Sequence, residues 1–260
     1  MNTLLILAFI LFALMLAVGG KKGVKSFFSL FFNFLVVLIS IVFMTDSSVD
    51  PIMVTAISST IIAGINLFFI NEVNGKTVTA FISTVITIGV LFSFIYIFTK
   101  ISMIQGFGEE EIDEIIAVYS ILNGVDFVKV AASVIIMSTL GAIIDVAISI
   151  TSPMQEIFNH HPTIKRKDLF TSGMKIGKDI LGSNANTLFF AFIGGYLALL
   201  IWFKDLSYSF LEIINSKIFT AEVITISTAG IGIALVIPIA AFINAYYLCR
   251  NRKSNKESTP

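Results

Sequence analysis

The chain has 260 residues, of which 56% are hydrophobic and only 13% are Asp, Glu, Lys or Arg, and its mean hydropathy is +0.94. Soluble domains carry charge on about a quarter of their residues, so this composition excludes an ordinary soluble protein and predicts an integral membrane protein. The 17 basic and 17 acidic residues balance, which gives no general electrostatic attraction for nucleic acid.

Seven apolar runs are each about long enough to cross the hydrocarbon core of a bilayer as a helix. We therefore predict an all-α, polytopic helical membrane protein with about seven transmembrane helices, with six or eight as the alternatives. The first run has Lys21 and Lys22 after it rather than before it, so we interpret it as a retained helix and not as a cleavable signal peptide. The predicted spans are Thr3 to Val18, Phe27 to Met44, Ile52 to Ile70, Val78 to Thr99, Phe127 to Ile150, Ala185 to Phe203 and Val223 to Leu248.

The loops between these spans predict an orientation, because Lys and Arg gather on the cytoplasmic side of membrane proteins. With seven spans and an external N-terminus, 13 of the 17 Lys and Arg fall in cytoplasmic segments. The exceptions are Lys100, Lys129, Lys204 and Lys217. We therefore predict that the N-terminus is outside and the C-terminus is in the cytoplasm.

The predicted spans form two halves. Residues 1–126 hold four spans and an external segment, 101–124, in which Glu109 to Leu122 has apolar residues at helical spacing and so predicts an amphipathic helix. Residues 127–250 hold the last three spans and a polar cytoplasmic loop over 151–184, and 251–260 form a polar cytoplasmic tail. We expect Ser152 and Pro153 to end the fifth helix.

Within the predicted cytoplasmic loop, basic residues and three glycines suggest a short helix lying at the membrane surface. Lys178 and Asp179 are candidates for a cytoplasmic gate there. The alternative is a positively charged loop that only fixes the topology.

Asp145 is the only acidic residue within a predicted span, and a charged side chain at that depth costs at least about 2.5 to 3.5 kcal/mol. Ser138, Gly141, Asp145 and Ser149 are three or four residues apart, which places them on one helix face. We expect this face to point into the helix bundle or a wet cavity, as a functional site. The alternative is a carboxyl group that stays protonated or caps a helix and only fixes packing.

The sixth and seventh spans carry two more faces of small or hydrogen-bonding residues, and we expect the sixth to pack against Asp145. The predicted ion or proton pathway is Asp145 with Thr187, Asn184 and Asn186 as hydrogen-bonding partners. We expect Pro238 to kink or loosen the last helix. The predicted helix-packing positions are Gly141, Ser138, Ser149, Gly194, Gly195 and Gly232.

Few residues of the sequence are candidates for metal binding or catalysis. Cys249 is the single cysteine and His160 and His161 are the two histidines, so we predict no metal site and no cofactor. The sequence offers no Ser/His/Asp set and no second carboxylate at membrane depth, so we expect a protein that is not an enzyme.

Three segments resemble, in order and spacing, signature segments of the YibE/F-like family of bacterial multi-pass membrane proteins. They are GAIIDVAISITSPMQEI (Gly141 to Ile157), SGMKIGKDILGSNANTLFFAFIGG (Ser172 to Gly195) and AEVITISTAGIGIALVIPI (Ala221 to Ile239). The family pattern has arginine where Lys178 and Thr225 stand, so a charge pair that uses the second of these arginines is not expected here. The C-terminal half is also remotely similar to the last helices of SecF and resistance-nodulation-division proteins.

The resemblance implies a protein of the bacterial plasma membrane with no established activity, found beside a larger YibE-like relative. Our leading hypothesis is a transport or export subunit in which Asp145 couples to a proton or cation. The second hypothesis is a scaffold or assembly factor that transports nothing. The partners expected are membrane lipid and either the larger YibE-like protein or further copies of this chain, and no nucleic acid.

Overall fold

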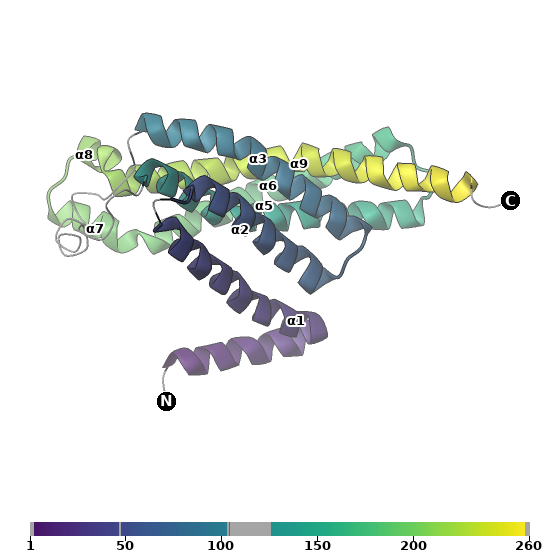
Figure 1. The fold of residues 1–260 in the computed structure, drawn as a ribbon, viewed down its shortest axis with the longest axis horizontal. Coiled ribbons are helices and arrows are strands. Elements are labelled where there is room, and N and C mark those ends of the chain that lie inside the picture. The colour runs from purple at the N-terminus through teal and green to yellow at the C-terminus, as the bar shows by residue number, and fades with distance from the viewer. Residues whose placement is uncertain (1–2, 47, 103, 105–125, 258–260) are drawn as a thin grey trace.

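The computed structural model describes residues 3–46, 48–102, 104 and 126–257, and all regular structure in these residues is helical (Figure 1). The predicted amphipathic helix Glu109 to Leu122 lies outside the described residues. The elements are α1 (Thr3–Met44), α2 (Pro51–Gly64), the π-helix η1 (Ile65–Phe69), α3 (Gly75–Ser102), α5 (Phe127–His160), α6 (Arg166–Gly195), α7 (Leu197–Asp205), α8 (Phe210–Asn215) and α9 (Lys217–Glu257).

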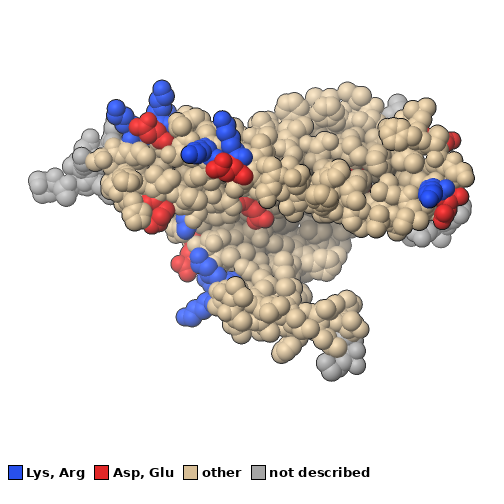
Figure 2. All heavy atoms as spheres, turned by 180° about the vertical axis from the view of Figure 1, so that it is seen from behind, with Lys and Arg blue, Asp and Glu red and all other residues tan. Residues whose placement is uncertain are grey.

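Five of the described helices are long and apolar enough to cross a membrane, namely α1, α2 with η1, α3, α5 and α9. A sixth candidate span exists if α6 and α7, which are bent by 48° relative to each other, count as one. Figure 2 shows Lys, Arg, Asp and Glu mainly toward the two ends of the long axis, with a broad uncharged stretch between them. These features confirm an all-helical protein with several membrane spans.

Helix α1 consists of two arms joined by a turn at Gly20. Gly20 has φ 53° and ψ −133°, a left-handed backbone conformation that glycine adopts without the penalty of a Cβ. A Cβ on Gly23 would overlap the carbonyl oxygen of Met15, and the rings of Phe12 and Phe27 lie 4.9 Å apart. The chain therefore doubles back, as Figure 1 shows, and the first two predicted spans are the two arms of α1.

The core of the molecule lies where α9 packs against α3, α5 and α6. Gly232 permits the closest approach, because a Cβ there would lie 2.9 Å from Cδ1 of Ile143 and 3.0 Å from Cδ1 of Leu91. Helix α2 packs against α5, and the second arm of α1 packs against α2. Helix α9 continues through Pro238 as one helix, so this proline does not end it.

The expectation that Ser152 and Pro153 end the fifth helix is wrong, because α5 continues through Pro153 to His160. A proline inside a helix removes one hydrogen bond, and here the long contact of α5 with α3 and α9 outweighs that loss.

Most of the predicted polar loop 151–184 is therefore helical, since α6 begins at Arg166. Gly173 is buried against α5 and α9, where a Cβ would overlap Met154 of α5 and lie 2.9 Å from Cβ of Ala241 of α9. Gly177 is buried against α9, where a Cβ would overlap Ile237. Close helix packing through these two glycines is the reason why a segment rich in charge and glycine is a helix.

Candidate functional site

Asp145 lies on α5 with its side chain on the exposed face of the helix. Ser138, Gly141 and Ser149 are also exposed, so the predicted stripe exists as a continuous strip on the surface of the bundle. The expectation that this face points into the bundle is wrong. The bundle instead uses the large apolar side chains of α5, such as Ile143, which is fully buried, because these side chains gain most from burial.

The structure does not bring the predicted partners of Asp145 to its carboxylate. Nδ2 of Asn184 donates to the carbonyl oxygen of Ile180 at 2.9 Å, and Oγ1 of Thr187 donates to that of Ser183 at 2.9 Å. Asn186 and Thr187 are exposed on α6. Within the described part of the chain, no side chain donates a hydrogen bond to Asp145 or forms an ion pair with it.

The remaining predicted positions divide into packed and open ones. A Cβ on Gly141, Gly194 or Gly195 would meet nothing within 4 Å among the described residues, whereas Gly232 is tightly packed. The exposed side chains of Lys178 and Asp179 lie on α6 next to the buried Gly177.

Gly194 and Gly195 lie directly before the bend between α6 and α7. They do not lie at a contact between two helices of the described residues. At this bend the hydroxyl group of Tyr196 donates to Oε1 of Glu222 on α9 at 2.6 Å. The ring of Tyr196 also lies 5.3 Å from that of Phe192. The bend is therefore attached to the start of the last span.

The structure shows a buried polar junction between α3, α5 and α9 that sequence reasoning missed. Oγ1 of Thr79 donates to Oδ1 of Asn244 at 3.1 Å, and Nδ2 of Asn244 donates to the carbonyl oxygen of Thr151 at 3.0 Å. All three residues are fully buried. The signal was present in the sequence as a single amide within the apolar run IAAFINAYY of the last span.

A series of hydroxyl groups continues from this junction along α3. Ser83 donates to the carbonyl oxygen of Thr79 at 2.6 Å, and Thr87 donates to that of Ser83 at 2.7 Å. These residues are four apart and buried, so each hydroxyl group is satisfied by its own helix. Three other buried hydroxyl groups, those of Ser59, Thr84 and Thr99, have no hydrogen-bond partner among the described residues. The junction can therefore fix the positions of three helices, and it holds no titratable group.

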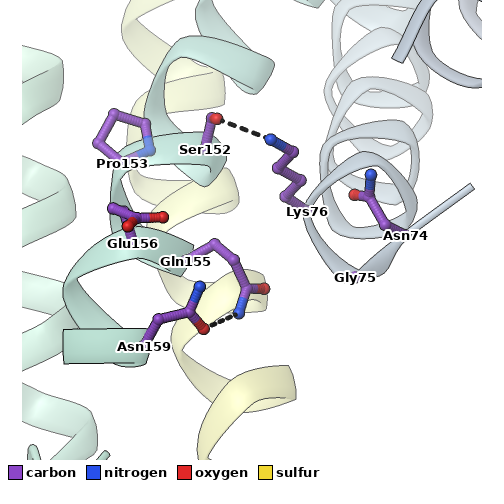
Figure 3. A pocket seen from close by; sticks show the side chains of 8 residues that line it. All are labelled: Asn74, Gly75, Lys76, Ser152, Pro153, Gln155, Glu156 and Asn159. Atoms are coloured by element: carbon purple, nitrogen blue, oxygen red, sulfur yellow. Dashed lines mark hydrogen bonds between the residues drawn. The ribbon is translucent and has the colours of Figure 1, made fainter. Parts of the chain in front are cut away.

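An open hollow of about 570 Å³ lies between the start of α3 and the C-terminal part of α5 (Figure 3). Lys76 reaches across from α3, and its Nζ lies 3.2 Å from Oγ of Ser152. The hollow combines segments that are more than seventy residues apart, which is why no local pattern predicted it.

An ion pair joins the start of α2 to the start of α5, at the end of α5 that lies away from the hollow. Nζ of Lys129 lies 2.6 Å from Oδ2 of Asp50, and Oδ1 of Asp50 accepts from the backbone N–H of Ile52 at 2.9 Å as the N-cap of α2. The hydrogen bond from Lys129 is the main cause that lowers the pKa of Asp50. Oγ of Ser133 also contacts the carbonyl oxygen of Pro51 at 3.3 Å.

Among the described residues, no group of three or more His, Cys, Asp or Glu side chains could hold a metal ion. Glu156 and His160 form a pair at 3.1 Å on one turn of α5, and both are exposed.

Comparison with known proteins gives one finding that covers most of the chain. The family model described as YibE/F-like protein matches residues 7–250. The match includes the N-terminal half, where sequence reasoning found no specific motif. No curated protein and no solved structure matches the chain.

Proposed function

Because the chain belongs to the YibE/F-like family of membrane proteins, we propose that it is a membrane subunit of a bacterial transport or export system. In this role Asp145 takes up and releases a proton, or binds a cation, at a face of α5 that another subunit covers. The role is not enzymatic, and it needs no resident metal or cofactor.

One observation carries this proposal, namely the outward orientation of a carboxylate near the middle of an apolar span. An ionised carboxylate that faces hydrocarbon costs several kcal/mol, so acidic residues at this depth face protein or water. Ser138, Gly141 and Ser149 flank Asp145 with small side chains, which allow a second helix to approach closely. A covering subunit would supply the hydrogen-bond donors that the described chain lacks.

We propose that the covering subunit is a larger YibE-like membrane protein, with a second copy of this chain as the alternative. Asn186 and Thr187 on α6 are exposed as well, and in this proposal the covering subunit contacts them too. Two helices of one chain would then contribute to the same intramembrane contact.

The proposal includes seven spans in the bacterial plasma membrane, with the N-terminus outside and the C-terminus in the cytoplasm. Counting the two arms of α1 separately, and α6 with α7 as one bent span, gives this number. The distribution of Lys and Arg over the loops supports this orientation.

Ion flux in vesicles that contain the assembled complex tests the role of Asp145. We expect the Asp145→Asn variant to lose at least about tenfold of proton- or cation-dependent flux, because the amide cannot exchange a proton or balance a cation. The Asp168→Asn variant is the matched control, since Asp168 is an exposed acid in the first turn of α6. Equal flux in the two variants, at equal amounts of complex, would contradict the coupling role.

The second candidate function is a scaffold that assembles a larger complex and transports nothing. The outward orientation of Asp145 favours it, because a contact surface needs no cavity within the chain. In that case Asp145→Asn lowers the recovery of the complex after purification, while the flux per complex stays unchanged.

A further inference from the structure

The hollow between α3 and α5 lies where two candidate spans reach the same end of the bundle. Helix α3 begins at Gly75, and α5 ends at His160, so the first residues of one span lie beside the last residues of the other. In a membrane protein, the ends of the membrane spans lie at the depth of the phospholipid head groups. The hollow is open to the surface of the chain, so a ligand can reach its lining residues from outside.

The α3 wall of this hollow carries a cation that no carboxylate balances. Nζ of Lys76 contacts the neutral hydroxyl group of Ser152, and among the described residues no carboxylate oxygen lies within 4 Å of it. The positive end of the α3 dipole points the same way, because Gly75 starts the helix. This wall therefore favours an anionic group such as a phosphate.

The α5 wall presents the carboxylate of Glu156, whose Oε1 also lies 3.1 Å from Nε2 of the exposed His160. Glu156 lines the hollow, and one amide pair borders it, in which Nε2 of Gln155 donates to Oδ1 of Asn159 at 3.0 Å. Figure 3 shows Lys76 directed to the side chain of Ser152 on α5, with Gln155, Glu156 and Asn159 on the same helix. A ligand that carried only negative charge would meet Glu156, whereas one with an anion and an ammonium group would satisfy both walls.

The walls are held at a fixed spacing by a close contact at Gly75. A Cβ there would lie 2.9 Å from Cε1 of Tyr247 and 3.4 Å from Oε1 of Gln155, so the absence of a side chain allows α3 to start against α5 and α9. Asn74 fixes the first turn, since its Oδ1 accepts from the backbone N–H of Thr77 at 3.1 Å. The hollow is thus formed by ordered helix ends.

We propose that this hollow binds the phosphoethanolamine head group of an aminophospholipid, with the phosphate at Lys76 and the start of α3 and the ammonium group at Glu156. Basic side chains between helices at a membrane surface bind the phosphate of lipid head groups. This hollow has Lys76 for a phosphate and adds the carboxylate of Glu156 for an ammonium group. The ammonium group donates hydrogen bonds to a carboxylate, which the quaternary group of a choline lipid cannot do.

Native mass spectrometry of the full chain in detergent, with added phosphatidylethanolamine, phosphatidylcholine or phosphatidylglycerol, tests this proposal. We expect phosphatidylethanolamine to bind in preference to the other two lipids. Lys76→Gln should lower its binding by roughly tenfold, because a charge-assisted contact to the phosphate is lost. Lys76→Arg should retain binding. Glu156→Gln should remove the preference over phosphatidylglycerol without weakening phosphatidylglycerol itself.

The Lys167→Gln variant is the matched control, because Lys167 is an exposed lysine at the start of α6 that does not line the hollow. Equal lipid binding by Lys76→Gln and Lys167→Gln would overturn the proposal, as would equal binding of the three lipids by the unchanged protein. If water-soluble glycerophosphoethanolamine competes at concentrations similar to those of the lipid, the ligand is not specifically a membrane lipid, and this would overturn the proposal. Weak competition supports a membrane lipid as the ligand.

Discussion

Asn244 is the residue on which three helices of this bundle depend for a shared hydrogen-bonded contact. Replacing it by alanine would leave the hydroxyl group of Thr79 and the carbonyl oxygen of Thr151 without this partner. We expect the Asn244→Ala variant to lose about 1 to 3 kcal/mol of unfolding free energy, toward the lower limit if helices in the unfolded state find other partners. Denaturant titration in mixed micelles measures this loss.

The control for this prediction is Asn186→Ala, which removes an exposed amide from α6. A purified single chain should tolerate that change within about 0.5 kcal/mol. Equal losses in the two variants would mean that the buried junction contributes nothing specific to stability.

Gly177 gives a second prediction at this scale, because a side chain there would overlap Ile237 of α9. We expect Gly177→Leu to destabilise the chain by about 1 to 3 kcal/mol through overpacking, and to lower the yield of folded protein. Gly182→Leu on the same helix is the control, since a Cβ at Gly182 meets nothing within 4 Å among the described residues. Thermal unfolding monitored by aggregation compares the two variants.

The sequence predicted correctly that Asp145 shares a helix face with Ser138, Gly141 and Ser149, but not which way that face points. Periodicity places residues on a common face, whereas the direction of the face depends on which neighbouring helices pack most favourably. The outcome here depends on the branched apolar side chains of α5, which fill the space between α3 and α9. The direction in which the face points therefore cannot be predicted from the aspartate itself.

At the scale of elements, the ion pair between α2 and α5 predicts how the stability of the fold depends on pH. The hydrogen bond from Lys129 holds the pKa of Asp50 below its ordinary value of 3.8. A carboxylate with a lowered pKa stabilises the folded state above pH 3.8, and this stabilisation is lost as the pH falls through the lowered value. We expect Asp50→Asn to unfold at a lower temperature than the parent at pH 7, with the difference vanishing in acid.

Asparagine is also a good N-cap residue, so this substitution tests the ion pair rather than the cap. The Lys129→Gln variant should show the same loss at pH 7, and the double variant should lose no more than either single one, because both substitutions remove one interaction. Additive losses would show that the two side chains act independently. The expected effect is small, since both side chains are partly exposed.

Element boundaries were predicted less well than element types. Apolar runs predicted the helical spans, but Pro153 indicated a helix end where α5 continues to His160. The segment after Lys165 predicted only a short surface helix within a loop, whereas α6 is one helix over Arg166–Gly195. Local signals for a break were outweighed by contacts made at a distance, among them Gly173 against Met154 and Ala241. The π-helix η1 was not predicted. The bend at Tyr196 follows Gly194 and Gly195, a pair typical of a helix break that was interpreted as a helix-packing feature.

For the whole molecule, the proposed orientation can be tested with cysteine labelling. In a Cys249→Ser background, a Lys22→Cys variant places a thiol at the turn of α1, and an Asp205→Cys variant places one at the end of α7. With seven spans and an external N-terminus, we expect an impermeant maleimide to label position 205 in intact cells. Position 22 should react only after the membrane is permeabilised, and the reverse pattern would contradict the orientation.

The family and the membrane character of the chain could both be predicted from the sequence, because they depend on composition and on three motifs. The hollow at Lys76 and the junction at Asn244 could not. Each joins residues from segments that only folding brings together, such as Thr79 and Asn244, and a single sequence contains no information on their distance.

The turn at Gly20 has a consequence for how the chain enters a membrane. A single residue joins the two arms of α1, so there is no linker that would let one arm insert first and the other wait in water. If both arms cross, they enter as a pair. The ammonium groups of Lys21 and Lys22 then remain on the side where the ribosome delivers the chain, because carrying either one through the hydrocarbon layer costs about 2.5 to 3.5 kcal/mol.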